Sequence, residues 1–261
     1  MEETLEFPVL LQLIDDRSAA FRAAIAAAPS LDVQVPTCPE WTLFDLVQHV
    51  GEGRRAWAAT VQAGPDATDK ADPLGDATAP REPEALQAWL AESTQLLLDA
   101  LREAGPDRGC WGSWGKSQLP LTCAGAARRQ LHEIAVHTYD AQLTVGAAQP
   151  VPEQIALDGV EEFLLTFCTT TEAWPHEPAV VGYHATEGRS WRHWLDADGS
   201  RLARLDAAGT ADATAEAVVG SIEGAANELL LAFYDRIPFD SVKIDDDQGV
   251  IGRLVEWDPE R

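Results

Sequence analysis

Apolar residues recur every three or four positions through the first half of the chain. Leu10, Ile14, Phe21 and Ile25 form one such series, and Pro29 follows it. This spacing places apolar side chains on one face of a helix, and a proline ends a helical pattern. The first helix is therefore predicted to begin near Leu10 and to end before Pro29.

Three more helices are predicted by the same pattern before residue 150. The second follows the motif "VPTCPEWT", in which Thr42 and Asp45 resemble a capping box at a helix start. Loops rich in Gly, Pro and Asp separate the helices. The expected spans are residues 43–62, a leucine-faced helix through 86–101, and residues 121–145.

The second half of the chain changes to shorter elements. The stretch "GAAQPVPEQ" is typical of a linker, and strand-like runs then alternate with the turn signals "TEGR" and "DADG". The expected helices are 155–166 and 223–236, and the expected strands are 179–185, a hairpin within 189–205, 241–246 and 249–257.

These elements predict two domains. Four long helices joined by loops are typical of a four-helix bundle, which we expect over residues 1–148. The mixed elements predict a smaller α+β domain over residues 152–261.

The charge of the chain excludes some partners. The 261 residues include 43 acidic and 19 basic side chains, which gives a formal net charge of −24. Such a surface repels nucleic acid and anionic lipid, so we expect neither as a partner. No apolar run is long enough to span a membrane, and "MEETLEF" lacks the basic start of a signal peptide. We therefore expect a cytoplasmic protein; a small-molecule substrate is expected only from the family resemblance described below.

The cysteines do not suggest a zinc site of their own. Cys38, Cys110, Cys123 and Cys168 form no CxxC pair, and in a reducing cytosol they are expected as thiols. Cys123 and Cys168 lie in apolar helical surroundings and are expected in the core, whereas Cys38 is expected to pack at a helix start.

Candidate chemistry lies in the stretch "LHEIAVHTYD". Glu133 and His137 are four residues apart, so they share one helix face, whereas His132 points in another direction. A carboxylate and an imidazole at this spacing can bind one divalent ion inside a bundle. A solvated face or a simple hydrogen-bonded pair is the alternative interpretation.

A third ligand must come from another helix. His49 is the histidine on the second helix, at the edge of its apolar stripe and one turn after Asp45. Its position alone favours a core-edge histidine bonded to a backbone carbonyl. The residues by themselves therefore leave the metal site open.

Both motifs resemble those of a known family, the mycothiol-dependent maleylpyruvate isomerase-like proteins of the DinB-like superfamily. The resemblance rests on a Cys-Pro-x-Trp turn followed by a helix histidine, and on a Glu-x-x-x-His helix followed by an aromatic residue and Asp. A leucine-rich late helix that ends at Arg236 extends the resemblance to the second domain. The matching residues are Cys38, Pro39, Trp41, Thr42, Asp45, Leu46, His49, Glu133, His137, Tyr139 and Asp140.

The resemblance implies a divalent metal, zinc by expectation, held by His49, Glu133 and His137. Three protein ligands leave a position for a water or thiol, as in catalytic sites. The family's thiol is a cofactor, mycothiol, whose pKa a metal would lower. The implied reactions are thiol-assisted cis–trans isomerisation and thiol transfer to an electrophile, with Arg236 holding a substrate carboxylate.

Two other classes of function remain open. A metal-dependent hydrolase would need a general base, for which Asp45 is the candidate. A non-catalytic metal-binding or ligand-binding module would need none. Asp45 is otherwise expected as a helix-start acid, and Arg236 as a helix-end cap.

Several other residues carry weaker expectations. Tyr139 and Asp140 are expected to serve packing and capping, and Trp111 and Trp114 either to border the site or to close the bundle end. His184 and His193 flank a predicted hairpin turn and could meet across it. Gly51 and Gly53 lie inside a predicted helix, which indicates a close approach by another helix or a ligand.

Overall fold

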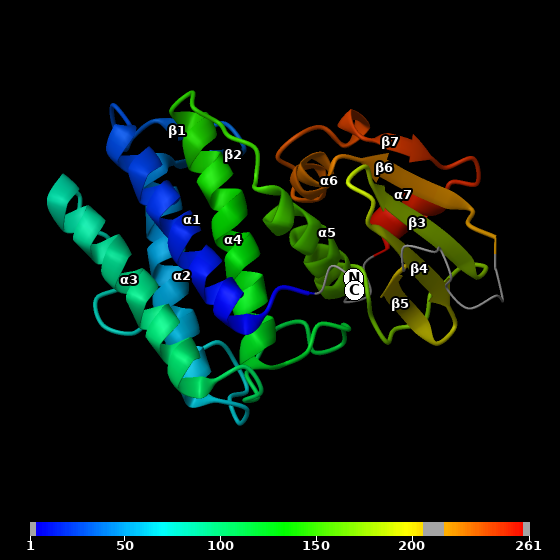
Figure 1. Cartoon of the computed structure of the whole chain (residues 1–261), viewed down its shortest axis with the longest axis horizontal. Coiled ribbons are helices and arrows are strands. Elements are labelled where there is room, and N and C mark those ends of the chain that lie inside the picture. Colours follow the sequence, from blue (N-terminus) through cyan, green and yellow to red (C-terminus); the bar gives the residue numbers. More distant parts are fainter. Residues whose placement is uncertain (1–3, 206–216, 258–261) are drawn as a thin grey trace. The chain divides into compact units, whose positions relative to one another are not determined.

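The computed structural model describes residues 4–205 and 217–257, and the chain forms two compact units (Figure 1). The bundle unit contains Leu5–Ser113 and Pro120–Val151. The C-terminal unit contains Trp114–Leu119 and the described residues from Pro152 onward. The predicted succession of a helical part and a smaller strand-containing part is confirmed.

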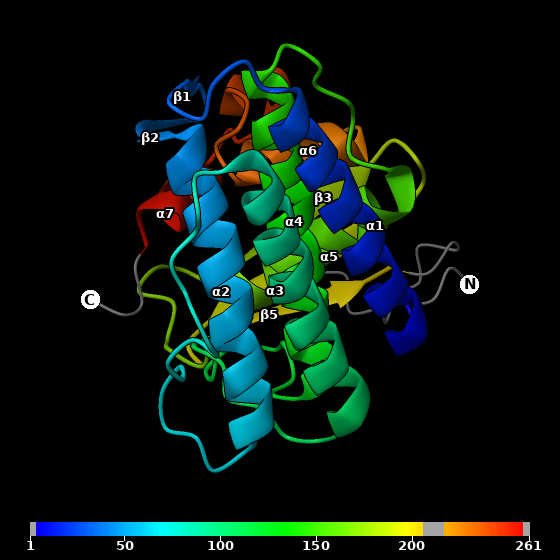
Figure 2. The same ribbon diagram turned by 90° about the vertical axis from the view of Figure 1, so that its left-hand side faces the viewer.

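Four long helices make up the bundle unit, as the apolar spacing predicted. α1 packs against α4, and α2 packs against α3, as Figure 2 shows from the side of the bundle. The helices are α1 (Phe7–Ala27), α2 (Leu43–Ala63), α3 (Pro83–Ala104) and α4 (Cys123–Thr144).

The core of the bundle unit takes side chains from all four helices. Phe21, Leu46, Leu86 and Ile134 belong to one buried cluster. Each comes from a different helix, so the four apolar faces meet in a common core.

The segment before α2 was expected as a turn and instead contains two short strands, β1 (Gln34–Val35) and β2 (Cys38–Thr42). They pair antiparallel. Gln34 Nε2 donates to the carbonyl oxygens of Pro39 and Trp41, at 2.6 Å each. These hydrogen bonds hold the backbone of β2, which leads into α2, in its conformation.

The predicted capping box begins α2. The Asp45 amide donates to Thr42 Oγ1 at 3.3 Å, and the Thr42 amide donates to Asp45 Oδ2 at 2.8 Å. Two backbone donors at the helix start are thereby satisfied.

The C-terminal unit contains a mixed five-stranded sheet in the order β5-β4-β3-β6-β7. β3 and β6 are parallel, and the other pairs are antiparallel. The unit consists of α5 (Glu153–Phe167), β3 (Ala179–Ala185), β4 (Ser190–Asp196), β5 (Gly199–Arg204), β6 (Gly220–Gly224), α6 (Ala226–Phe233), the 3-10 turn η1 (Phe239–Ser241), β7 (Lys243–Asp245) and α7 (Val250–Glu256).

The strand predicted at 249–257 is wrong, because these residues form α7. Asp246 accepts hydrogen bonds from the Ile251 and Gly252 amides at 3.0 and 3.1 Å and caps the helix start. Val250 and Ile251 are both buried and lie beside Gly220 of β6. Two consecutive buried residues fit one helix turn, whereas a strand would point them to opposite faces.

Strand β6 was not predicted. Its sequence, Gly-Ser-Ile-Glu-Gly, has glycine at both ends and one apolar side chain. Backbone pairing with β3 and β7 stabilises this strand, whose local sequence has little preference for a strand.

Among the helices in residues 4–205 and 217–257, none is long and apolar enough to cross a membrane.

Candidate metal centre

Three side chains predicted from the sequence lie together inside the bundle unit. His49 comes from α2, and Glu133 and His137 come from α4. His49 Nε2 lies 3.0 Å from Glu133 Oε1, and His137 Nε2 lies 3.2 Å from the same oxygen. Nitrogen and oxygen atoms of all three residues lie within 4.8 Å of one another. The fold therefore joins the two motifs, which are separated by 84 residues.

The group is open on the side of His49. The side chains of His49 and Glu133 are 42% and 30% exposed, whereas that of His137 is 9% exposed. Trp41, which β2 places before α2, lies 4.8 Å from the His49 ring between centroids. A small molecule can therefore reach the group beside an aromatic side chain.

Asp140 fixes the ring of His137. Its Oδ2 lies 2.8 Å from His137 Nδ1, and its Oδ1 accepts a hydrogen bond of 2.6 Å from Thr37 Oγ1. The expected capping roles of Tyr139 and Asp140 are wrong, because α4 continues to Thr144. Asp140 instead directs Nε2 of His137 towards Glu133, the arrangement that supports a histidine ligand.

Hydrogen bonds and charge set the protonation of the pair on α4. Burial opposes ionisation of Glu133, but bonds from His137 and His49 outweigh it and hold its pKa well below the usual range. Burial also opposes the charged form of His137, but bonds to Asp140 and Glu133 outweigh it and raise the pKa of His137 to about 9. Without a bound ion, these shifts favour a carboxylate paired with an imidazolium at neutral pH.

The donor set fits a divalent cation. Two imidazole nitrogens and one carboxylate oxygen are common ligands of catalytic zinc, at about 2.0–2.2 Å from the ion. Tetrahedral geometry then separates ligand atoms by roughly 3.3 Å, close to the 3.0 and 3.2 Å found around Glu133 Oε1. The ligand atoms of the three residues lie within 4.8 Å of one another, so the two histidine nitrogens would face one ion after a change of side-chain position.

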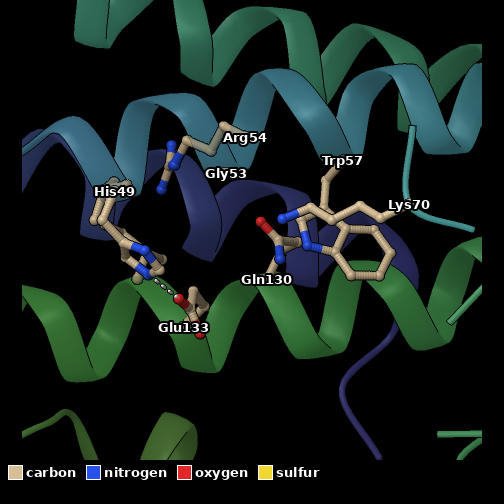
Figure 3. Close-up of a pocket in the computed structure, with 9 residues that line it drawn as sticks. His49, Gly53, Arg54, Trp57, Lys70, Gln130 and Glu133 are labelled. Carbon is tan, nitrogen blue, oxygen red and sulfur yellow. Dashed lines mark hydrogen bonds and ion pairs between the residues drawn. The ribbon is translucent and has the colours of Figure 1, made fainter. Parts of the chain in front are cut away.

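A small cavity of about 50 Å³ adjoins the group (Figure 3). Arg54 and Trp57 reach it from α2, Gln130 and Glu133 from α4, and Lys70 from the loop after α2.

Trp111 lies near one of the residues that line this cavity. Its ring lies 6.3 Å from that of Trp57, which lines the cavity. The expectation that Trp111 and Trp114 border the site or close the bundle end stays a prediction.

Asp45 is engaged at the start of α2. Its Oδ2 accepts bonds from the backbone amide and the hydroxyl of Thr42, at 2.8 and 2.6 Å. The helix-start interpretation of Asp45 is confirmed, and these contacts give no sign of a general base.

His184 and His193 do not meet across the hairpin. His184 is opposite Ser190, and His193 is opposite Val181, so the two histidines lie on different faces of the sheet. Each has its own hydroxyl partner, Ser190 for His184 and Ser200 for His193, at 3.0 and 2.8 Å.

The cysteines follow the expectation of a core role in part. Cys123 is fully buried, Cys168 is partly buried, and Cys38 packs against the bundle core. Burial raises the pKa of Cys110 and of Cys168 to about 12, which makes these thiols poor nucleophiles.

The sequence did not point to the roles of Asp140, Arg54 and Gln130. Asp140 follows His137 by three residues, a spacing that also signals contact on a helix. Arg54 and Gln130 carried no motif, and only the packing of α2 against α4 shows that they face the same cavity.

The fold and the site define a class: a four-helix bundle with a histidine–carboxylate group that could hold a metal ion beside a cavity. Residues 11–142 match the family model described as the mycothiol maleylpyruvate isomerase N-terminal domain. This match covers half of the chain. The chain belongs to this family, and it is a maleylpyruvate isomerase-like enzyme.

Solved structures agree with this fold. Two crystal structures of the mycothiol-dependent maleylpyruvate isomerase, one of them of a point mutant, superpose with a TM-score of 0.57 each. Each match covers 92% of this chain and 93% of the other, at 14% sequence identity. No curated protein matches the chain in sequence.

Proposed function

We propose that this protein is a metal-dependent isomerase that uses a small thiol cofactor, mycothiol or a similar thiol, on an electrophilic substrate with a cis double bond. His49, Glu133 and His137 would hold the ion, with zinc as the expected metal. The observation that carries the proposal is the convergence of these three side chains, with His137 held by Asp140.

Each residue of the site has a defined task in this proposal. A bound divalent ion lowers the pKa of a thiol, so that the thiolate is available near neutral pH. Asp140 would keep Nε2 of His137 available to a bound ion, and Trp41 forms an apolar wall beside His49. Three protein ligands leave room for an external thiol.

The organisation and location of the enzyme are part of the proposal. Residues 1–148 would be the metal-binding domain and residues 152–261 a second domain. A reducing cytoplasm suits four cysteines that form no disulfide among the described residues.

The first experiment is the metal content of the wild type and of His49→Ala, purified in the same way. We expect about one equivalent of zinc in the wild type and a large loss in the variant, because one of three ligands is removed. His176→Ala, which changes an exposed histidine of the C-terminal unit, is the matched control and should keep the metal.

The same proteins are then assayed with maleylpyruvate in the presence and absence of added thiol. Thiol-dependent cis–trans conversion by the wild type, lost in His49→Ala, is the expected result. A stable thioether product would indicate S-transfer, and thiol-independent cleavage would indicate hydrolysis. Protein that binds no metal even after incubation with zinc would contradict the proposal.

Arg236 is a separate proposal, taken from the family resemblance. Its Nη1 donates to the carbonyl oxygen of Tyr234 at 2.6 Å, directly after α6. This contact supports a structural role at the helix end. If Arg236 holds a substrate carboxylate, Arg236→Lys should raise KM while the free energy of unfolding stays close to that of the wild type.

A further inference from the structure

Arg54 is a buried cation whose hydrogen bonding is incomplete. Its side chain lies in the interior of the bundle unit, and the residue is 3% exposed. Nη1 donates to Thr94 Oγ1 on α3. Nη2 is buried and has no hydrogen-bond partner among residues 4–205 and 217–257. A buried guanidinium donor without an acceptor costs free energy, so native proteins rarely leave one without a reason.

Arg55, the next residue on α2, is a buried arginine whose hydrogen bonding is complete. Arg55 is 2% exposed, and it donates to Ser93 Oγ, the Leu74 carbonyl and Glu92 Oε2 at 2.8, 3.1 and 2.7 Å. All three of its donor nitrogens have acceptors. Arg54, on the same helix, differs because its Nη2 has no acceptor among the described residues.

Arg54 lines the cavity beside the candidate metal ligands. His49 and Glu133 line the same cavity, and Figure 3 shows the side chain of Arg54 extending from α2, the helix that also carries His49. The cavity volume of about 50 Å³ holds a few water-sized groups, which is the room that a carboxylate needs. Gly53 contributes space, because a Cβ atom built there meets nothing within 4 Å.

The polar lining of the cavity favours an anion. Lys70 is one of three lysines in a chain with a net charge of −24, and it lines this cavity together with Arg54. Gln130 adds a carboxamide to the lining of the cavity. Burial lowers the pKa of Arg54 to about 10, so the guanidinium keeps its charge at neutral pH.

The carboxylates near Arg54 do not accept the hydrogen bond that Nη2 can donate. Glu133 and Asp15 act on Arg54 through their charge, and Arg22 opposes them. Neither carboxylate accepts a hydrogen bond from Nη2. Glu133 is engaged by His49, His137 and Arg129.

We propose that Arg54, together with Gln130, binds a carboxylate of the substrate in the cavity beside His49 and Glu133. The guanidinium supplies a charge-assisted hydrogen bond from Nη2, and Gly53 leaves room for the carboxylate. This inference rests on the proposed function, because it assumes that the small electrophile is an acid. It would explain how a substrate is held next to a metal-bound thiol.

The test is the binding of two probes to the zinc-loaded protein without thiol, measured by calorimetry. Maleate carries two carboxylates, and maleamide is its neutral diamide. We expect Arg54→Gln to weaken maleate binding about tenfold to a hundredfold and to leave maleamide binding unchanged. Arg55→Gln is the matched control and should keep the wild-type preference for maleate.

A second variant keeps the inference testable if Arg54→Gln does not fold. Gly53→Leu retains Arg54 but extends a side chain into the cavity, so it should weaken maleate binding at least tenfold. Folded Arg54→Gln with the wild-type preference for maleate, or Gly53→Leu with unchanged maleate binding, would overturn the inference.

Zinc content, measured first, separates this inference from the proposed function. If the wild type takes up no zinc, the metal-dependent function fails. The same titration of the metal-free protein then tests Arg54 alone, because Arg54 is not one of the three proposed ligands.

Discussion

At the scale of single residues, Asp140 decides how His137 can act. An imidazole with a free ring can present either nitrogen, and the partner of one nitrogen selects the other for a ligand. Asp140 is fully buried and holds Nδ1, while Thr37 holds Asp140. The protein itself thereby fixes the orientation of the His137 ring.

Asp140→Asn should weaken zinc binding about tenfold to a hundredfold, because a neutral amide replaces the carboxylate behind a histidine ligand. Competition with a chelator of known affinity measures the change. Asp45→Asn removes a carboxylate of the same type from the start of α2 and should leave zinc affinity unchanged. Equal zinc affinity in Asp140→Asn and the wild type would refute this role of Asp140.

At the scale of elements, two glycines of α2 have different reasons to be there. A Cβ atom at Gly51 would lie 2.0 Å from Cζ3 of Trp89, whereas one at Gly53 meets nothing within 4 Å. Gly51 therefore permits the close approach of α3. Gly53 borders the cavity beside the candidate ligands.

The pair gives opposite predictions for stability. Gly53→Ala should raise the free energy of unfolding of the bundle unit by about 1 kcal/mol, the helix preference of alanine over glycine. Gly51→Ala has the same helix gain, but its clash with the Trp89 ring should cost about 1–3 kcal/mol or more. Urea unfolding followed by circular dichroism compares the two.

Each variant controls for the other, because both make the same chemical change two residues apart on one helix. If Gly51→Ala proved as stable as Gly53→Ala, the packing explanation for Gly51 would be wrong.

At the scale of the whole molecule, the two compact units have different buried polar groups. The bundle unit contains the candidate metal centre, which is open on the side of His49, whereas the C-terminal unit encloses His193, which is fully buried. His193 Nε2 lies 2.8 Å from Ser200 Oγ, and Nδ1 lies 3.4 Å from Tyr183 Oη. Burial lowers the pKa of His193 to about 4, so this unit holds a neutral imidazole.

The C-terminal unit should therefore lose stability in acid. Between the unfolded pKa of about 6.5 and the folded pKa of about 4, the unfolded chain binds a proton that the folded unit does not. Stability consequently falls as pH falls through this window, by at most about 3 kcal/mol. Urea unfolding at pH 7 and pH 4, followed through amide signals of β3 and β4, measures the loss.

His193→Gln removes the titrating group and keeps a polar side chain at this position. Its stability should fall less between pH 7 and pH 4 than that of the wild type. An identical fall in both proteins would assign the acid sensitivity to carboxylates instead of His193.

The sequence by itself determined the four bundle helices, the capping box of α2, the strand β3 and the hairpin of β4 and β5. These features depend on local periodicity, turn residues and capping, which are written in adjacent positions. The Glu133–His137 pair could be predicted for the same reason, because residues four apart share a helix face.

Other features depend on tertiary packing. It brought His49 next to Glu133, directed Asp140 to His137, and turned Arg54 and Gln130 to one cavity. It also made a helix of α7 and a strand of β6, where pairing and burial against the sheet outweigh a weak local pattern. Contacts between distant segments depend on how helices and strands pack, and no local period in a single sequence records that packing.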